Sequence, residues 1–187
     1  MEKSSMSLSS DITELESEKE KLRLVAMTDT LTGAANRLKF NTMMDKFVDL
    51  SLRYETPLSI MMFDIDNFKK VNDEYSHRVG DEVLKELVNA VSENVRKADL
   101  FVRWGGEEFL IVLANTNIDN AAVAAEKFRK NIEEVSFTEI GHLTCSFGVA
   151  CMEKDDTISS FISRADEALY QSKASGRNRV TAVAKKV

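Results

Sequence analysis

Two pairs of carboxylates lie beside apolar runs, where strands of a sheet are expected to end. Asp64 and Asp66 close one apolar run, and Glu107 and Glu108 follow a pair of glycines. Hard cations such as magnesium bind carboxylate and carbonyl oxygens, commonly one or two carboxylates together with substrate phosphates. The pattern therefore favours metal-assisted phosphoryl transfer. Either pair taken alone is usually found as solvated acids of a turn.

The glycines beside the second pair add to this interpretation. Gly105 and Gly106 have no side chains, so a phosphate or a base can approach the backbone closely. They also separate two apolar segments, and a Gly-Gly pair in that position predicts a tight hairpin turn of the primed type. Composition and spacing alone thus indicate a metal-dependent nucleotide site without identifying its reaction.

The spacing of apolar residues predicts the helices and strands that carry these groups. Stretches with apolar residues at helical spacing alternate with short, nearly continuous apolar runs. One hairpin combined with helical connections predicts an α/β (α+β) fold, a mixed sheet flanked by helices. The expected helices are 37–54, 67–75, 80–97, 119–135 and 157–175, and the expected strands are 58–64, 100–104, 107–114, 142–152 and 179–184.

The overall composition limits the classes of partner. The 187 residues have a formal net charge of −6 and are 43% hydrophobic, which suits one domain with a short appendage. Proteins that bind long nucleic acids usually present a basic face to the phosphates, so a nucleic-acid polymer is not expected as a partner. No apolar run approaches the ~20 residues that span a bilayer, and the polar N-terminus lacks a secretion signal. We therefore expect a cytoplasmic protein without a membrane span.

The first 27 residues differ from the rest of the chain. Residues 1–10 are polar and rich in serine, which predicts disorder, and residues 11–27 are predicted to form a helix. Leu8, Leu15 and Leu22 recur every seven residues, as in a short coiled coil. An amphipathic helix packed on its own domain explains this pattern equally well. The predicted organisation is a disordered tip and a helix over 1–27, followed by a domain over 28–187 that carries both carboxylate pairs.

Six sequence blocks across residues 29–180 resemble the motifs of the GGDEF family of diguanylate cyclases, in the family's order. The resemblance implies a palm-like fold, as in nucleotidyl cyclases, with a mainly antiparallel five-stranded sheet. The blocks are Asp29–Arg37, Phe63–Asp73, Tyr75–Asp81, Arg103-Trp-Gly-Gly-Glu-Glu-Phe109, Ser146–Ala150, and Ala165–Tyr170 with Lys173 and Gly176-Arg177-Asn178.

The resemblance also implies a metal site and a reaction. It implies that Asp64, the backbone carbonyl of Ile65 and Glu107 hold two Mg²⁺ ions, with Mn²⁺ as a possible substitute. Glu107 is further implied as the base for the 3′-hydroxyl of GTP. Two domains, each holding one GTP, face one another in a homodimer and form cyclic di-GMP with release of two pyrophosphates. The N-terminal helix is then expected to connect the domain to an upstream sensory domain in a bacterial signalling protein.

The same resemblance assigns the substrate contacts. Asn72 and Asp81 are expected to bind guanine, whose N1–H and N2–H₂ donors suit a carboxylate acceptor. His77 is expected to contact the substrate, although a structural histidine is the alternative. The remaining expected contacts are the glycines at 105 and 106 and the phosphate-binding cations Lys69, Lys173 and Arg177, the last three of which could also be ordinary exposed helix residues.

Product inhibition is implied by a separate motif. Arg96 and Asp99 form an R-x-x-D sequence four residues before Arg103, and the family binds its cyclic di-GMP product there. Lys127 occupies the place of a further arginine, so weaker inhibition is expected. The alternative function is a catalytically silent GGDEF domain that acts as a receptor for GTP or cyclic di-GMP.

Overall fold

The computed structural model describes residues 18–19 and 26–183. The heptad leucines Leu8, Leu15 and Leu22, and most of the predicted helix over 11–27, lie outside the described residues. The coiled-coil hypothesis and the division of the chain at residue 27 therefore stay predictions. Among the residues that are described, no helix is long and apolar enough to cross a membrane.

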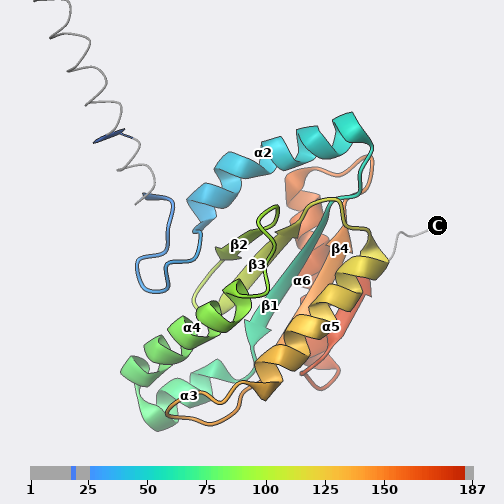
Figure 1. The fold of residues 1–187 in the computed structure, drawn as a ribbon. Coiled ribbons are helices and arrows are strands. Elements are labelled where there is room, and N and C mark those ends of the chain that lie inside the picture. Colours follow the sequence, from blue (N-terminus) through green and yellow to red (C-terminus); the bar gives the residue numbers. More distant parts are fainter. Residues whose placement is uncertain (1–17, 20–25, 184–187) are drawn as a thin grey trace, which may run out of the picture.

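A five-stranded sheet forms the centre of the molecule (Figure 1). The strand order is β2-β3-β1-β4-β5, with antiparallel pairing except between β4 and β5, which are parallel. The predicted α/β class, the order of elements and the mainly antiparallel sheet are confirmed. In chain order the elements are α2 (Arg37–Tyr54), β1 (Ser59–Ile65), α3 (Phe68–Tyr75), α4 (His77–Ser92), β2 (Leu100–Arg103), β3 (Glu108–Leu113), α5 (Ile118–Glu134), β4 (Cys145–Cys151), α6 (Ile158–Ala174) and β5 (Val180–Val183).

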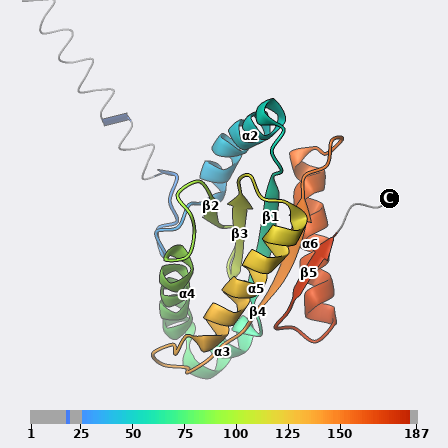
Figure 2. The ribbon, with the colours of Figure 1, turned by 45° about the vertical axis from the view of Figure 1, so that its right-hand side comes forward.

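Helices cover both faces of the sheet, so the core has two halves. Alternate strand residues such as Met61 and Phe63 face α4 and α5, and their neighbours such as Ile60 and Met62 face α2 and α6. Figures 1 and 2 show α4 and α5 across one face, with α6 behind the sheet. The strand β1, buried along its whole length, lies between the two halves, as its continuous apolar run predicts.

One glycine allows a close contact between a helix and the sheet. A Cβ at Gly148, on β4, would lie 2.1 Å from the carbonyl oxygen of Ala165 and 2.2 Å from the amide nitrogen of Leu169. Both atoms belong to the backbone of α6 and cannot turn aside as a side chain would. The position of α6 against β4 therefore depends on the absence of a side chain at residue 148.

The predicted primed turn at the hairpin is wrong. Neither Gly105 nor Gly106 has a positive φ, whereas a primed type I turn needs positive φ at both central residues. β2 ends at Arg103 and β3 begins at Glu108, which leaves a longer loop of four residues. The amide of Trp104 donates to the carbonyl of Glu108 over 2.8 Å at its base. The loop is thus wide enough to present its glycines and Glu107 outside the sheet.

The predicted helix over 80–97 also differs from the structure. Ser76 has a φ of 103° and separates α3 from α4, so α4 begins at His77, three residues earlier than predicted. It ends at Ser92, and the amide of Asp99 donates to the carbonyl of Arg96 over 3.0 Å in a following turn. Arg96 therefore belongs to the connection between α4 and β2.

Candidate active site

The two principal carboxylates lie at the same end of neighbouring strands. β1 pairs with β3 so that Asp64 stands opposite Glu108, and the amide of Ile65 donates to the carbonyl of Glu107 over 3.4 Å. The ring of Phe63 stacks on Phe109 and on Phe147 of the two flanking strands, with ring centroids 5.3 and 4.8 Å apart. This aromatic row holds the strands in register directly beside the acidic end.

Asp64 lies in an environment that favours a cation. Asp64 is only 7% exposed, and the Nζ of Lys173 on α6 lies 2.9 Å from its Oδ2. Burial, together with the smaller effect of the Glu107 and Glu108 charges, raises the pKa of Asp64 to about 6 against the opposing effect of Lys173. A buried carboxylate of this kind is stabilised in its charged form by a nearby positive ion.

The donor set suits a hard divalent cation. The described residues contain no group of three or more His, Cys, Asp or Glu side chains placed to hold a metal. Two carboxylates and the main-chain oxygen of Ile65 instead give an oxygen-only set that leaves positions for phosphate and water oxygens, which is how magnesium is commonly bound. The donor types of these residues therefore fit the metal that the family resemblance implies.

Asp66 has a different role from Asp64, although the sequence places it in the same acidic pair. Its carboxylate accepts hydrogen bonds from Ser146 Oγ over 2.7 Å, from Thr144 Oγ1 over 2.6 Å and from the amide of Asn178 over 3.0 Å. The residue is 8% exposed. These donors make Asp66 a buried connection between β4 and the α6–β5 loop.

Arg103 shapes the glycine loop and was not identified as a site residue from the sequence. Its guanidinium donates to the carbonyl of Gly106 over 3.1 and 2.7 Å and to Asp29 Oδ1 over 2.8 Å. Burial alone would raise the pKa of Asp29, but hydrogen bonds from Thr32 and Arg103 hold it below its usual value. The first sequence block is thereby tied to the loop that carries Glu107.

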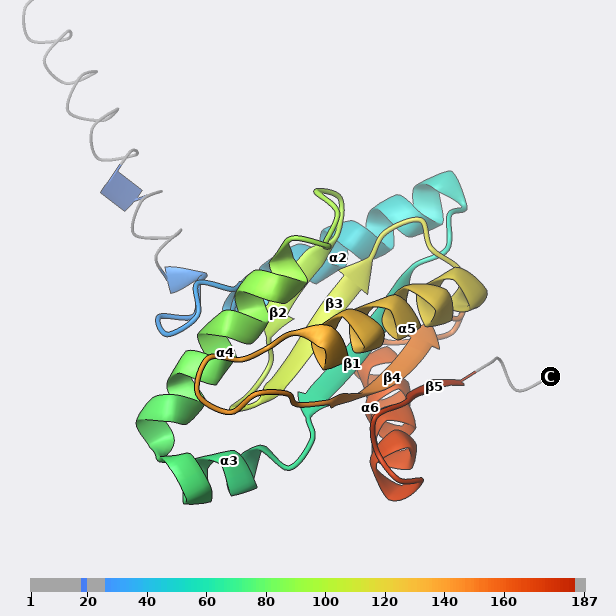
Figure 3. The same ribbon diagram turned by 60° about the horizontal axis from the view of Figure 1, so that its bottom comes forward.

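The expected guanine contacts lie together on α3 and α4, beyond the end of β1 (Figure 3). Asn72 packs against Gly80, where a Cβ would lie 2.0 Å from the Asn72 Oδ1. Asp81 is the next residue along α4 and is exposed, as is His77 in the first position of the same helix. The absence of a side chain at Gly80 thus leaves room for the side chain of Asn72.

The three expected phosphate contacts come from separate elements. Lys69 is exposed on α3, and Lys173 near the end of α6 reaches Asp64. Arg177 is exposed in the loop before β5. The structure brings Lys173 to the acidic end directly, whereas neither Lys69 nor Arg177 forms an ion pair with another residue in the described part of the chain.

Comparison with known proteins identifies the family. The family model described as "Diguanylate cyclase, GGDEF domain" matches residues 26–179. The chain belongs to the GGDEF family. Diguanylate cyclase DgcM of Escherichia coli K12 is 40% identical over 172 residues, which are 92% of this chain and 42% of DgcM. The response regulator PleD of Caulobacter vibrioides is 41% identical over 162 residues, 83% of this chain and 36% of PleD.

Solved GGDEF structures share the fold. The coiled coil and GGDEF domain of DgcB from Caulobacter crescentus, in complex with c-di-GMP, has a TM-score of 0.85 at 29% identity and covers 94% of this chain and 95% of that one. An active GGEEF domain of a diguanylate cyclase from Vibrio cholerae has a TM-score of 0.76 at 36% identity, covering 81% and 98%. The predicted family and fold are confirmed, and the chain spans less than half the length of DgcM and PleD.

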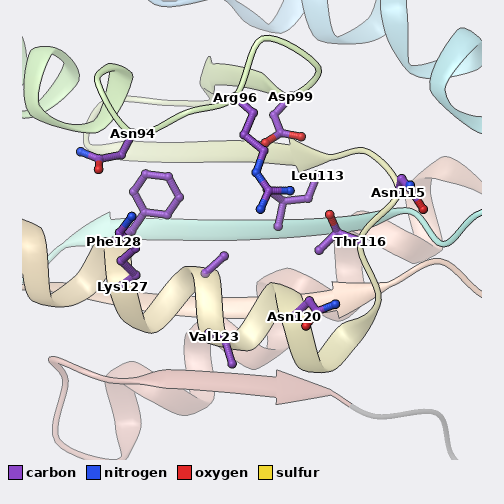
Figure 4. A pocket seen from close by; sticks show the side chains of 11 residues that line it. Asn94, Arg96, Asp99, Leu113, Asn115, Thr116, Asn120, Val123, Lys127 and Phe128 are labelled. Carbon is purple, nitrogen blue, oxygen red and sulfur yellow. The ribbon is translucent and has the colours of Figure 1, made fainter.

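The R-x-x-D residues of this GGDEF domain line a cavity of about 420 Å³ between the α4–β2 connection and α5 (Figure 4). Arg96 and Asp99 lie on one side, and Asn120 and Lys127 on the α5 side. Burial raises the pKa of Asp99, despite the hydrogen bond from the amide of Ala114 and the charge of Arg96. The structure thus brings the three predicted product contacts to one cavity.

Proposed function

We propose that the chain is a diguanylate cyclase that condenses two GTP molecules into cyclic di-GMP and two pyrophosphates. The observation that supports this most is the pairing of the buried Asp64 with the glycine loop of Glu107 at one strand end, inside a family of diguanylate cyclases. Members of this family use a divalent metal. We further propose that the metal here is Mg²⁺, two ions for each site, with Asp64, the Ile65 carbonyl and Glu107 as ligands.

In this proposal the site residues have separate roles in one nucleotidyl transfer. Asn72 and Asp81 hold guanine, with His77 beside the substrate, and the backbone of Gly105 and Gly106 leaves room for the nucleotide. Glu107 accepts the proton of the attacking 3′-hydroxyl. The O3′–P bond forms as the bond to pyrophosphate breaks. The bound divalent cation supplies charge neutralisation at the phosphates, and the cations on the β- and γ-phosphates are Lys69, Lys173 and Arg177.

Each domain would hold only one of the two GTP molecules. The 3′-hydroxyl of each must reach the α-phosphate of the other, so we propose that the active form is a homodimer with its two half-sites facing. We also propose that an upstream sensory domain controls this pairing, since the chain spans less than half of DgcM and PleD.

Product formation tests the proposal against the receptor alternative. The purified chain is incubated with Mg²⁺ and either GTP or ATP, and products are separated by chromatography. We expect cyclic di-GMP and pyrophosphate from GTP, and no cyclic dinucleotide from ATP. Tight binding of cyclic di-GMP without any turnover, even when dimers are enforced by a fused coiled coil, would favour a receptor instead.

Gly80→Ala is expected to raise the KM for GTP about tenfold, with a smaller change in kcat. The added methyl group displaces the Asn72 side chain, whose Oδ1 lies 2.0 Å from the ideal Cβ position, and one hydrogen bond is worth about 1 kcal/mol or somewhat more. Steady-state kinetics with GTP measure the change. If the effect acts through Asn72, the double variant with Asn72→Ala resembles Asn72→Ala alone, whereas additive losses would contradict this mechanism.

We also propose that cyclic di-GMP inhibits the enzyme from the cavity of Arg96, Asp99 and Lys127. Arginine suits this role because its guanidinium binds phosphates and the Hoogsteen edge of guanine. Arg96→Ala is expected to raise the cyclic di-GMP concentration for half-inhibition at least about tenfold. Arg78→Ala is the control, because this exposed arginine pairs with Glu139 outside the cavity lining. Equal inhibition of both variants and the wild type would place the inhibitory site elsewhere.

A further inference from the structure

The loop that carries Arg177 has an unusual backbone. Gly176, Arg177 and Asn178 have φ values of 112°, 64° and 46°, so three successive residues have positive φ. Arginine adopts this conformation rarely, since its Cβ then crowds the backbone. Such a loop keeps its shape only where surrounding groups hold it. The neighbouring residue Asn178 makes the contacts that do so.

Asn178 is bonded through its backbone and through both ends of its side-chain amide. Its amide N–H donates to Asp66 Oδ2 over 3.0 Å, and its Nδ2 donates to Glu133 Oε1 over 2.8 Å. Its Oδ1 accepts from the guanidinium of Arg129 over 2.6 Å. Asparagine also tolerates positive φ better than most residues. The residue therefore suits both the conformation and the contacts of the loop.

The groups that hold Asn178 are themselves fixed. The Arg129 side chain is 11% exposed and also pairs with Glu126 and Glu133 on α5. Hydrogen bonds from Arg129 and Asn178 lower the pKa of Glu133, which keeps its charge in place. On the other side, Asp66 is anchored by Ser146 of β4 and by Thr144, the residue before that strand. The loop is thus clamped between α5 and the strand end that carries Asp64.

We propose that Asn178, held by Arg129, Glu133 and Asp66, positions Arg177 for the triphosphate end of the nucleotide. These are positioning residues, because they act through the loop and need not touch substrate. The inference rests on the proposed function only in assigning Arg177 to the phosphates. It adds α5, the helix that carries Arg129 and Glu133, to the elements that determine the affinity for GTP.

The α5 carboxylates offer a matched pair of variants. Glu126 and Glu133 both pair with Arg129 and have similar side-chain exposure, 41% and 44%, but of the two only Glu133 has a described hydrogen bond to Asn178. Glu133→Ala therefore loosens the loop directly, whereas Glu126→Ala removes two hydrogen bonds from Arg129 but neither of the side-chain bonds of Asn178. Asn178→Gly is the third variant. It keeps a residue suited to positive φ and the backbone N–H to Asp66, and it removes the side chain.

Binding of the α,β-methylene analogue of GTP, which cannot release its β- and γ-phosphates as pyrophosphate, is measured by calorimetry with Mg²⁺. GMP, which lacks the β- and γ-phosphates, is measured in parallel. We expect Asn178→Gly and Glu133→Ala to bind the analogue at least about fivefold more weakly, with GMP affinity unchanged. Glu126→Ala is expected to stay within about twofold of the wild type for both ligands. Melting temperatures identify any variant that fails to fold.

Three results would overturn the inference. The first is wild-type affinity of the folded Asn178→Gly and Glu133→Ala proteins for the analogue. The second is an equal loss for Glu126→Ala, and the third is an equal loss for GMP, since neither would be specific to the loop and the triphosphate. Turnover of GTP by the wild type is recorded separately. An inactive wild type whose analogue binding still depends on Asn178 would contradict the proposed function and leave the positioning role supported.

Discussion

Glu107→Gln is expected to lower the rate of cyclic di-GMP formation on the order of 10³-fold. The amide cannot accept the proton of the 3′-hydroxyl, a step worth roughly 10²- to 10⁴-fold, and it is also a weaker ligand for a divalent cation. Initial rates with saturating GTP and Mg²⁺ measure the loss. Binding of Mn²⁺ followed by electron paramagnetic resonance gives an independent measure of the metal site.

Two further variants test whether this loss is specific to Glu107. Glu108→Gln changes the next residue, which is paired into β3 opposite Asp64, and is expected to retain most of the activity. Asp64→Asn is expected to weaken Mn²⁺ binding at least as much as Glu107→Gln, because Asp64 is the buried carboxylate. If Glu107→Gln kept wild-type activity, or if Glu108→Gln were the inactive variant, the assignment of the base and metal ligand to Glu107 would be wrong.

Gly148→Ala is expected to destabilise the domain by about 3 kcal/mol or more, the upper part of the range for overpacked cores. The new methyl group would meet backbone atoms of Ala165 and Leu169 at 2.1 and 2.2 Å, so α6 must move away from β4. Equilibrium unfolding in urea, monitored by circular dichroism, measures the change. Since α6 also carries Lys173, activity should fall even where the variant remains folded.

Gly106→Ala is the matched control for stability. A Cβ at Gly106 would have no neighbour within 4 Å, and its φ is not positive, so the same added methyl group should change the free energy of unfolding by less than about 0.5 kcal/mol. Equal destabilisation by both substitutions would show that the contact between Gly148 and α6 has been misjudged.

The sequence was sufficient for features that depend on local pattern. The continuous apolar run before Asp64 predicts a buried central strand, and β1 is buried along its length. The position of Asp64 and Glu107 beside strand ends predicts that they lie near each other, and the register of β1 and β3 places Asp64 opposite Glu108, the residue after Glu107. The family motifs then supplied what spacing alone could not, namely the nucleotide and the reaction implied for these groups.

Features that depend on distant contacts were missed. Asp66 stands two residues from Asp64, and only the folded chain shows that Thr144, Ser146 and Asn178 satisfy its carboxylate. The bond to Asn178 joins residues 112 positions apart, beyond the reach of any periodicity. Arg103 was part of a recognised motif, but its bond to Asp29 could not be read from the sequence.

The two local errors have physical reasons as well. A primed turn was predicted at Gly105-Gly106 because glycine permits positive φ, but glycine also adopts negative φ, as both glycines do here. The guanidinium of Arg103 instead holds a wider loop by donating to the Gly106 carbonyl. Arg96 was placed in a helix because the helical pattern continues into polar residues. Short-range turn bonds end the helix at Ser92 and leave Arg96 beside the cavity.

Condensation of two GTP molecules by two facing domains is tested by the initial rate of cyclic di-GMP formation over a series of protein concentrations. We expect a rate that rises more steeply than linearly at low concentration, with two GTP consumed and two pyrophosphates released for each cyclic di-GMP. We also expect excess Glu107→Gln protein to suppress this rate. A rate strictly proportional to protein from the lowest concentration, with no effect of the inactive copy on a dilute chain shown to be monomeric, would contradict condensation by two facing domains.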